Sequence, residues 1–216
     1  MTTMLRADCE QFIEDIPVEW VRGRRGPAGP TWTDLRVLLG LLTTCRPVRC
    51  LEVGIHEGHT AQLLLEHGAN IEHYVGIDRT YTEQARSSPT AAGHLVADDP
   101  RVDLLVVEGG TRLLRPKDVP WKPFDWVFID SDHCYGGVQH DTEWVQPLLA
   151  ERSILIWHDY GVPSQYKPGT RPFGVMRYLD EWTGDPPIVS FIDPPHSSSI
   201  AFQRFLPPDP EPGRAA

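Results

Sequence analysis

Short runs of apolar and β-branched residues alternate with helical patterns along most of the chain, and this alternation constrains the fold more than any other feature. Parallel strands that are buried on both faces have such continuous apolar runs. Strands and helices in alternation predict a doubly wound α/β sheet. The five runs are RCLEVG (49–54), HYVGID (73–78), DLLVVEG (103–109), DWVFID (125–130) and SILIWHD (153–159).

Two further runs extend the predicted sheet near the end of the chain. PIVSFID (187–193) and SIAFQRF (199–205) are both strand candidates, and the short proline-rich loop between them has the spacing of a hairpin. A helix is predicted over 174–182, before them. The expected fold is therefore a doubly wound sheet of seven strands, mostly parallel, with a C-terminal antiparallel hairpin and helices on both faces.

The segments on either side of the sheet have their own patterns. Residues 1–30 are expected to form a helix and then a lid-like segment rich in glycine and proline. A helix is predicted from Thr31 to about Thr44, because Thr31 and Asp34 have the spacing of a capping box. Its apolar face consists of Leu35, Leu38, Leu39 and Leu42. Residues 207–216 contain four prolines in ten residues and are expected to be disordered.

Charge and hydropathy limit the partners of this chain. It has 216 residues, of which 20 are basic and 30 acidic, so its net charge is −10. Clustered lysine and arginine bind phosphate backbones, so we expect no nucleic-acid partner. The longest apolar run, 37–42, is far shorter than the roughly 20 residues that cross a membrane, so we expect no membrane partner. We expect a cytoplasmic protein that acts on a small molecule, and the sequence leaves homodimer formation open.

A glycine loop follows the first strand of the predicted sheet, where sheets of this kind bind ligands. Gly54 and Gly58 form the pattern G-x-x-x-G, and glycine lets a backbone turn sharply and approach a ligand. The dinucleotide pattern G-x-G-x-x-G has a glycine where this chain has His56, and the imidazole obstructs a pyrophosphate. Asp78 ends the second strand twenty residues after Gly58, where a carboxylate can bind two ribose hydroxyls. The loop therefore predicts a nucleoside ligand.

The pattern E-x-G-x-x-x-G at 52–58, followed by a strand that ends in Asp78, resembles the class I methyltransferases that depend on S-adenosylmethionine (SAM). The strand ends IDSDH (129–133) and HDY (158–160) are similar to those of the small-molecule O-methyltransferase branch. This branch is the methyltransferase domain 24 group, with macrocin O-methyltransferase-like and cephalosporin hydroxylase-like members. The resemblance covers about residues 45–205 and implies a Rossmann-like SAM-dependent methyltransferase domain over 31–206.

The resemblance implies an activity and a set of cofactor contacts. The activity is transfer of a methyl group to a hydroxyl of a small molecule, such as a sugar, a phenol or a natural-product-like compound. Two other classes stay open: a SAM-fold protein that binds without methyl transfer, and an NAD-dependent oxidoreductase, against which His56 counts. The implied contacts are Glu52, Gly54 and Gly58 at the methionine end, Asp78 at the ribose, Asp130 beside the cofactor, and the turn Glu108, Gly109, Gly110 and Thr111 at the adenine.

Two carboxylates are expected at one edge of the sheet, because Asp130 and Asp159 end neighbouring strands. Adjacent carboxylates repel, share a proton or share a cation, and oxygen ligands favour Mg²⁺, Ca²⁺ or Mn²⁺. Metal-dependent relatives have an acidic pair where this chain has His158 and Asp159, so the resemblance implies Asp130, His158 and Asp159 as metal ligands. The imidazole lowers the ligand charge by one, which leaves open whether a cation is required. The alternative for His158 is a core histidine under the next loop.

His133 is the first candidate for a general base. It lies three residues after Asp130, and some metal-dependent sugar methyltransferases have their base at that offset. An imidazole with a pKa near 6.5 can take a proton from a hydroxyl at neutral pH. Asp132 is the alternative, because other relatives use an aspartate at its offset. A third alternative has no base and acts through the metal or through proximity alone.

Two segments are expected to cover the substrate. One contains Trp20, Arg22, Arg24 and Arg25, and the other is the loop 160–173. The arginines either bind an anionic group of the substrate or form a solvated basic turn. The sequence does not identify the methyl acceptor.

Overall fold

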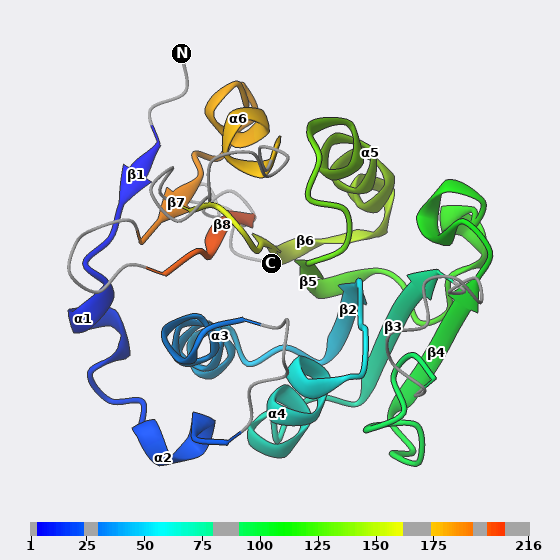
Figure 1. Cartoon of the computed structure of the whole chain (residues 1–216), viewed down its shortest axis with the longest axis horizontal. Coiled ribbons are helices and arrows are strands. Elements are labelled where there is room, and N and C mark those ends of the chain that lie inside the picture. Colours follow the sequence, from blue (N-terminus) through cyan, green and yellow to red (C-terminus); the bar gives the residue numbers. More distant parts are fainter. Residues whose placement is uncertain (1–3, 24–29, 80–90, 162–173, 192–197, 206–216) are drawn as a thin grey trace, which may run out of the picture.

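An eight-stranded sheet runs through the middle of the molecule (Figure 1). The computed structural model describes residues 4–23, 30–79, 91–161, 174–191 and 198–205. The strand order across the sheet is β1-β7-β8-β6-β5-β2-β3-β4. The strands are β1 (Leu5–Arg6), β2 (Arg49–Val53), β3 (His73–Arg79), β4 (Val102–Val107), β5 (Phe124–Ile129), β6 (Leu149–Trp157), β7 (Val189–Ser190) and β8 (Ala201–Phe205).

The pairing of the strands confirms the doubly wound sheet. From β2 the chain adds β3 and β4 on one side, and then β5 and β6 on the other, all in parallel. β8 is antiparallel to both of its neighbours, β6 and β7, which confirms the C-terminal hairpin. The strand β1, which the sequence analysis did not predict, pairs in parallel with β7 and adds an eighth strand to the seven expected.

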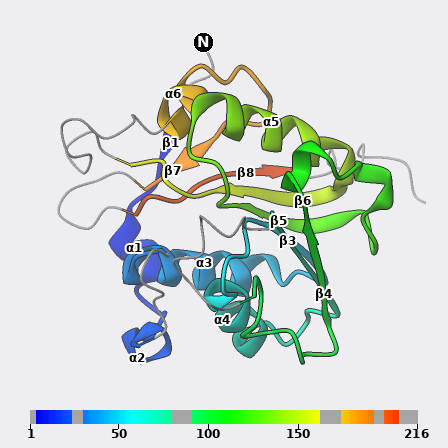
Figure 2. The ribbon, with the colours of Figure 1, turned by 45° about the vertical axis from the view of Figure 1, so that its right-hand side comes forward.

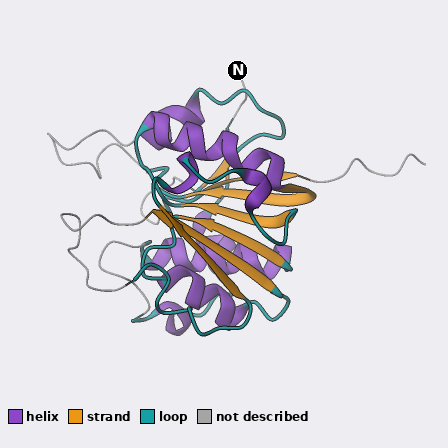
Figure 3. Cartoon of the chain, turned by 90° about the vertical axis from the view of Figure 1, so that its right-hand side faces the viewer, coloured by secondary structure: helices purple, strands orange, loops and turns teal. Residues whose placement is uncertain are grey.

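Helices cover both faces of the sheet, as predicted (Figures 2 and 3). α1, α3 and α4 lie on one face, and α5 and α6 lie on the other. The described residues also contain three short 3₁₀ turns. The bounds of the helices and of these turns are α1 (Cys9–Ile13), α2 (Val18–Val21), α3 (Trp32–Cys45), α4 (His59–His67), α5 (Tyr135–Val145), α6 (Gly174–Asp180), η2 (Gly110–Arg112), η3 (Pro116–Asp118) and η4 (Gln146–Leu148). None of the helices in the described part of the chain is long and apolar enough to cross a membrane.

The central strands are mostly apolar because each face of the sheet has a core of its own. In β5, Trp126 and Phe128 pack on the side of α3 and α4, whereas Val127 and Ile129 pack on the side of α5 and α6. Successive side chains of a strand point to opposite faces, so a strand covered on both sides needs apolar residues at every position. This arrangement explains the continuous runs in the sequence.

The start of α3 has the capping box that the sequence predicts. The Asp34 amide donates to Thr31 Oγ1 at 3.2 Å, and the Thr31 amide donates to Asp34 Oδ2 at 2.8 Å. The four leucines of the predicted apolar face, Leu35, Leu38, Leu39 and Leu42, are buried. The capping box fixes the first turn of α3, and with it the position of the Asp34 side chain.

The N-terminal segment packs on the sheet and on α3. The Ala7 amide donates to the Ser190 carbonyl at 2.9 Å, which continues the pairing of β1 with β7. Arg36, on α3, donates to the carbonyls of Ile13 and Ile16 at 2.7 and 2.8 Å. The predicted lid role of this segment stays a prediction, since residues 24–29 lie outside the described residues. The predicted disordered tail at 207–216 also lies outside them.

Candidate active site

The glycine loop joins β2 to α4 at the point where the strand order reverses. Gly54 and Gly58 have φ angles of 97° and 95°, in the left-handed region that favours glycine. A Cβ on Gly54 would overlap the carbonyl group of Asp130, at the end of β5. The Asp130 amide in turn donates to the Val53 carbonyl at 2.8 Å. Gly54 therefore lets the ends of β2 and β5 lie in direct contact, which brings the loop next to the predicted acidic cluster.

Asp78, at the end of β3, holds the glycine loop from the other side. Its carboxylate accepts the His56 amide on Oδ2 and the Arg79 amide on Oδ1, each at 2.7 Å. His56 has a φ of 47°, so the loop turns sharply at this residue. The structure thus brings Asp78 together with the glycine loop.

Glu52 lies inside the sheet layer and not on its open edge. Its side chain is buried, and the Tyr74 hydroxyl donates to Glu52 Oε2 at 2.7 Å. Burial raises the pKa of Glu52 well above its ordinary value, and it does the same for Tyr74. Because Tyr74 is on β3, this hydrogen bond joins the two strands that carry the loop and Asp78.

The turn after β4 contains the residues that the sequence assigns to the adenine. Gly109 and Gly110 both have left-handed φ angles, 73° and 56°. The Thr111 hydroxyl donates to Asp141, on α5, and the Ser131 hydroxyl donates to the other oxygen of the same carboxylate. Asp141 therefore joins the turn after β4 to the loop after β5, and the sequence analysis did not identify this residue.

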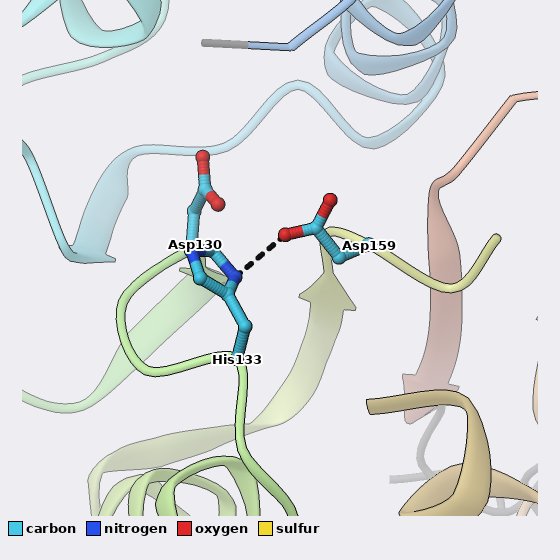
Figure 4. A group of neighbouring side chains, drawn as sticks. All are labelled: Asp130, His133 and Asp159. Atoms are coloured by element: carbon cyan, nitrogen blue, oxygen red, sulfur yellow. Dashed lines mark ion pairs between the residues drawn. The ribbon is translucent and has the colours of Figure 1, made fainter. Parts of the chain in front are cut away.

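Three side chains converge at the ends of β5 and β6. Asp130, His133 and Asp159 each offer one ligand atom, and these atoms lie within 4.8 Å of one another. His133 Nδ1 is 2.6 Å from Asp159 Oδ2 (Figure 4). This hydrogen bond raises the pKa of His133 above its ordinary value, although burial of the ring works against it. Burial opposes ionisation of Asp159, but hydrogen bonds from His133 and His158 outweigh it and hold its pKa well below the usual range.

His158 lies beside this group and faces three carboxylates. Its Nδ1 is 3.0 Å from Asp130 Oδ1 and 3.5 Å from Asp159 Oδ1, and its Nε2 is 3.5 Å from Asp34 Oδ2. The ring is about nine-tenths buried. Burial works against the charged imidazole, but the surrounding carboxylates, Asp130 first, raise its pKa well above the ordinary value. The predicted metal ligands Asp130 and Asp159 thus come together with His133, and His158 is not in the group whose atoms lie within 4.8 Å.

Asp132, the alternative base, belongs to a different set of contacts. It accepts the Cys134 amide at 3.1 Å, and the Arg112 guanidinium is 3.6 Å from its Oδ2. Burial opposes ionisation of Asp132, but these two neighbours outweigh it and lower its pKa. A carboxylate with a lowered pKa is a weaker base than an imidazole with a raised one.

The substrate segments are described only in part. Trp20, on α2, stacks on His67 with ring centroids 4.4 Å apart. His67 is the last residue of α4, so Trp20 lies at the end of that helix that is remote from the glycine loop. Arg24, Arg25 and residues 162–173 lie outside the described residues.

A parallel sheet with a glycine loop at its switch point and an acid–imidazole group at the same edge defines an α/β enzyme of the nucleoside-cofactor class. The chain belongs to the methyltransferase domain family, whose profile matches residues 51–160. That range contains the glycine loop, Asp78, His133 and Asp159. No curated protein sequence matches the chain.

Solved structures show the same fold at low sequence identity. The O-methyltransferase TomG from Streptomyces achromogenes, in complex with SAM, has a TM-score of 0.59 and 14% identity over 96% of this chain and 92% of its own. An O-methyltransferase from Bacillus cereus, in complex with S-adenosylhomocysteine (SAH), has a TM-score of 0.57 and 15% identity over 91% of each chain. The SAH-bound methyltransferase PaMTH1 from Podospora anserina has a TM-score of 0.58 and 18% identity over 92% of each chain.

Proposed function

We propose that this protein transfers the methyl group of SAM to a hydroxyl of a small molecule, such as a sugar, a phenol or a natural-product-like compound. One observation carries the proposal. A loop and a carboxylate suited to a nucleoside lie at the ends of β2 and β3, and the His133–Asp159 pair lies at the neighbouring ends of β5 and β6. The solved relatives were crystallised with SAM or SAH, which supports the choice of cofactor.

In this proposal the glycine loop binds the methionine end of the cofactor and Asp78 binds the ribose. Each carboxylate oxygen of Asp78 accepts one backbone amide, and these two hydrogen bonds orient the carboxylate beside the glycine loop. Gly109, Gly110 and Thr111 flank the adenine. Glu52 supports the loop through Tyr74, from inside the sheet.

His133 is proposed to remove the proton from the acceptor hydroxyl. An alcohol is a poor nucleophile while it is protonated, whereas SAM is already an activated electrophile, so the protein must supply the oxyanion. With Nδ1 hydrogen-bonded to Asp159, His133 takes the proton at Nε2. A positioned base of this kind contributes typically 10² to 10⁴-fold to the rate.

The carboxylates of Asp130 and Asp159 also fit a divalent cation, which would leave His133 in its role as the base. Oxygen ligands of this kind suit Mg²⁺ or Mn²⁺. Such a cation, when bound, lowers the pKa of an acceptor hydroxyl. We expect exhaustive EDTA treatment to lower the rate at least tenfold and added Mn²⁺ or Mg²⁺ to restore it. Full activity after EDTA treatment means that the three side chains act without a cation.

Calorimetry with SAH tests the cofactor assignment. Asp78→Ala should weaken SAH binding by about 1.5 to 3 kcal/mol, the range of hydrogen bonds to charged groups. Asp98→Ala, a change at an exposed aspartate between β3 and β4, is the control and should bind SAH like the wild type. NAD serves as the competing ligand, because an oxidoreductase would bind it. Equal SAH affinity in the wild type and in Asp78→Ala would show that Asp78 does not bind the ribose of the cofactor.

Transfer of a radiolabelled methyl group from SAM to a set of hydroxylated small molecules tests the reaction. His133→Ala should lower kcat on the scale of a general base while SAH affinity stays near that of the wild type. If His133→Ala keeps more than about a tenth of the activity and Asp132→Ala abolishes it, the base is Asp132. A protein that binds SAH and transfers no methyl group to any acceptor is a SAM-binding protein without this activity.

A further inference from the structure

A buried carboxylate of the first long helix reaches the site from the far side of His158. Asp34, on α3, is almost fully buried. Its Oδ1 accepts the Ser198 hydroxyl and the Ser199 amide, each at 2.6 Å, just before β8. Its Oδ2 accepts from Thr31 and lies 3.5 Å from His158 Nε2. One side chain therefore contacts α3, the start of β8 and the site.

From Asp34 the polar groups form a continuous line into the proposed active site. His158 lies between Asp34 and the two carboxylates at the strand ends. The next group is Asp159, and His133 Nδ1 lies 2.6 Å from it. Acids and imidazoles thus alternate in the order Asp34, His158, Asp159 and His133.

The geometry of His158 decides what this residue can do. Both ring nitrogens face carboxylate oxygens. An ionised carboxylate accepts hydrogen bonds and has no proton to donate. A metal ligand must instead offer a ring lone pair to the cation. In this position His158 Nδ1 hydrogen-bonds to Asp130 at 3.0 Å, and Nε2 lies 3.5 Å from Asp34 with no hydrogen bond among the described residues, so the role of the ring is to orient its neighbours.

We propose that Asp34 and His158 are positioning residues, which fix Asp130 and Asp159 and, through Asp159, the ring of His133. This inference rests on the proposed function, because His133 is the group that is positioned. Without His158 the carboxylates of Asp130, Asp159 and Asp34 would repel one another across a buried space. Asp34 anchors the far side of the ring in the way that outer carboxylates orient histidines in other active sites.

Asp34→Asn and His158→Asn test the line of contacts. Asp34→Asn removes the charge that faces His158. His158→Asn keeps an N–H donor near the position of Nδ1 but does not reach Asp34. Each variant should lower kcat about 10- to 100-fold, the effect typical of outer partners of an active site, with KM and SAH affinity near those of the wild type.

Ser198→Ala is the matched control, because it removes a hydrogen bond from Asp34 Oδ1 and leaves Oδ2 in place. It should lower the thermal stability without changing kcat. The double variant Asp34→Asn/His158→Asn should be no slower than His158→Asn alone, because Asp34 acts through His158. If Asp34→Asn does not fold, the kcat, KM and SAH affinity of His158→Asn test the positioning role instead. Losses in kcat that add up in the double variant would overturn the proposal.

The ring signals of His133 in ¹⁵N NMR spectra provide a readout that needs no substrate. They should shift in Asp34→Asn and stay unchanged in Ser198→Ala. If these signals and kcat are both unchanged in Asp34→Asn, the line is structural only and the inference is wrong. If the wild type transfers no methyl group but the signals of His133 respond, the proposed function fails and the positioning role stands.

Discussion

His133 and His158 contact the same carboxylate, Asp159, and yet their surroundings give them different chemistry. His133 is about half exposed and lies 2.6 Å from Asp159, whereas His158 is buried among three carboxylates. A group that exchanges a proton with a substrate must be reachable and must have a pKa near the working pH. The carboxylates around His158 raise its pKa well above the ordinary value in spite of its burial, and that burial keeps the ring away from a substrate. The different roles proposed for His133, as the base, and for His158, as a positioning residue, therefore follow from burial and partners and not from the residue type.

The pH dependence of the rate should report the contact between His133 and Asp159. A base must lose its proton first, so kcat should rise with pH through the pKa of His133, which Asp159 holds above 6.5. Asp159→Asn removes the negative charge, and the acidic limb of the kcat profile should move down towards 6.5 while kcat at the plateau falls. An acidic limb at the same pH in both proteins would show that it reports another group.

Glu52 should make the stability of the wild type fall as the pH rises. Its pKa is raised in the folded state, so its contribution is fully present below the unfolded pKa of about 4.5 and is lost as the pH rises through the folded pKa. Glu52→Gln cannot ionise and can still accept the Tyr74 hydroxyl. We expect urea unfolding between pH 4 and pH 8 to show that the free energy of unfolding of Glu52→Gln increases relative to that of the wild type as the pH rises. The increase should be at most about 1.4 kcal/mol per pH unit. A constant difference would mean that Glu52 titrates normally.

At the scale of elements, the start of α6 determines where His133 lies. The Gly174 amide donates to the His133 carbonyl at 2.6 Å. A Cβ on Gly174 would overlap the backbone of Cys134 and Tyr135, so only glycine allows this approach. The loop after β5 is thus fixed by a helix that follows it in the chain by about forty residues.

Gly174→Ala should therefore disturb both the fold and the site. We expect a loss of about 1 to 3 kcal/mol of stability from overpacking, together with a lower kcat because the loop with His133 must move. Gly136→Ala is the matched control: it lies in the first turn of α5, and nothing lies within 4 Å of the added methyl. This change should be neutral or stabilising by up to about 1 kcal/mol. Denaturant unfolding and kcat of the two variants give the comparison.

The sequence predicts elements well where local patterns determine them, and less well where partners do. The run 125–130 predicts β5 almost to the residue, because both of its faces are buried. The run 187–193 predicts a longer strand than β7, which spans Val189–Ser190 in the described residues. Pro186 precedes this run and Pro187 begins it, and a proline cannot donate to a neighbouring strand. The capping box of Asp34 was predictable from spacing, whereas its contacts with Ser198 and His158 depend on residues far away in the chain.

At the scale of the whole molecule, the N-terminal segment is part of the packed body. Phe12 packs against Gly40 of α3 and against Phe191, whose ring centroid is 4.9 Å away. Together with β1, these contacts join the first described residues to the edge of the sheet beyond β8. We therefore expect this segment to unfold together with the sheet.

Phe12→Ala tests that expectation. The ring is partly buried, so the change should lower the free energy of unfolding by about 2 kcal/mol, somewhat less than for a fully buried phenylalanine. The Tm should fall by about 4 to 8 °C within a single calorimetric transition. Val18→Ala, an exposed position on α2, should change the stability by less than about 0.5 kcal/mol. A separate early transition in the wild type would show that the segment melts on its own.

The place of β8 sets the order in which this molecule can be completed during synthesis. β8 is the last strand of the described residues, and yet it lies inside the sheet, between β6 and β7. Until it leaves the ribosome, β6 presents an open edge, and such edges invite pairing with other chains. The serines that hold Asp34 come just before β8. A nascent chain can therefore form the glycine loop early, but it brings Asp34, His158, Asp159 and His133 together in full only when β8 has inserted.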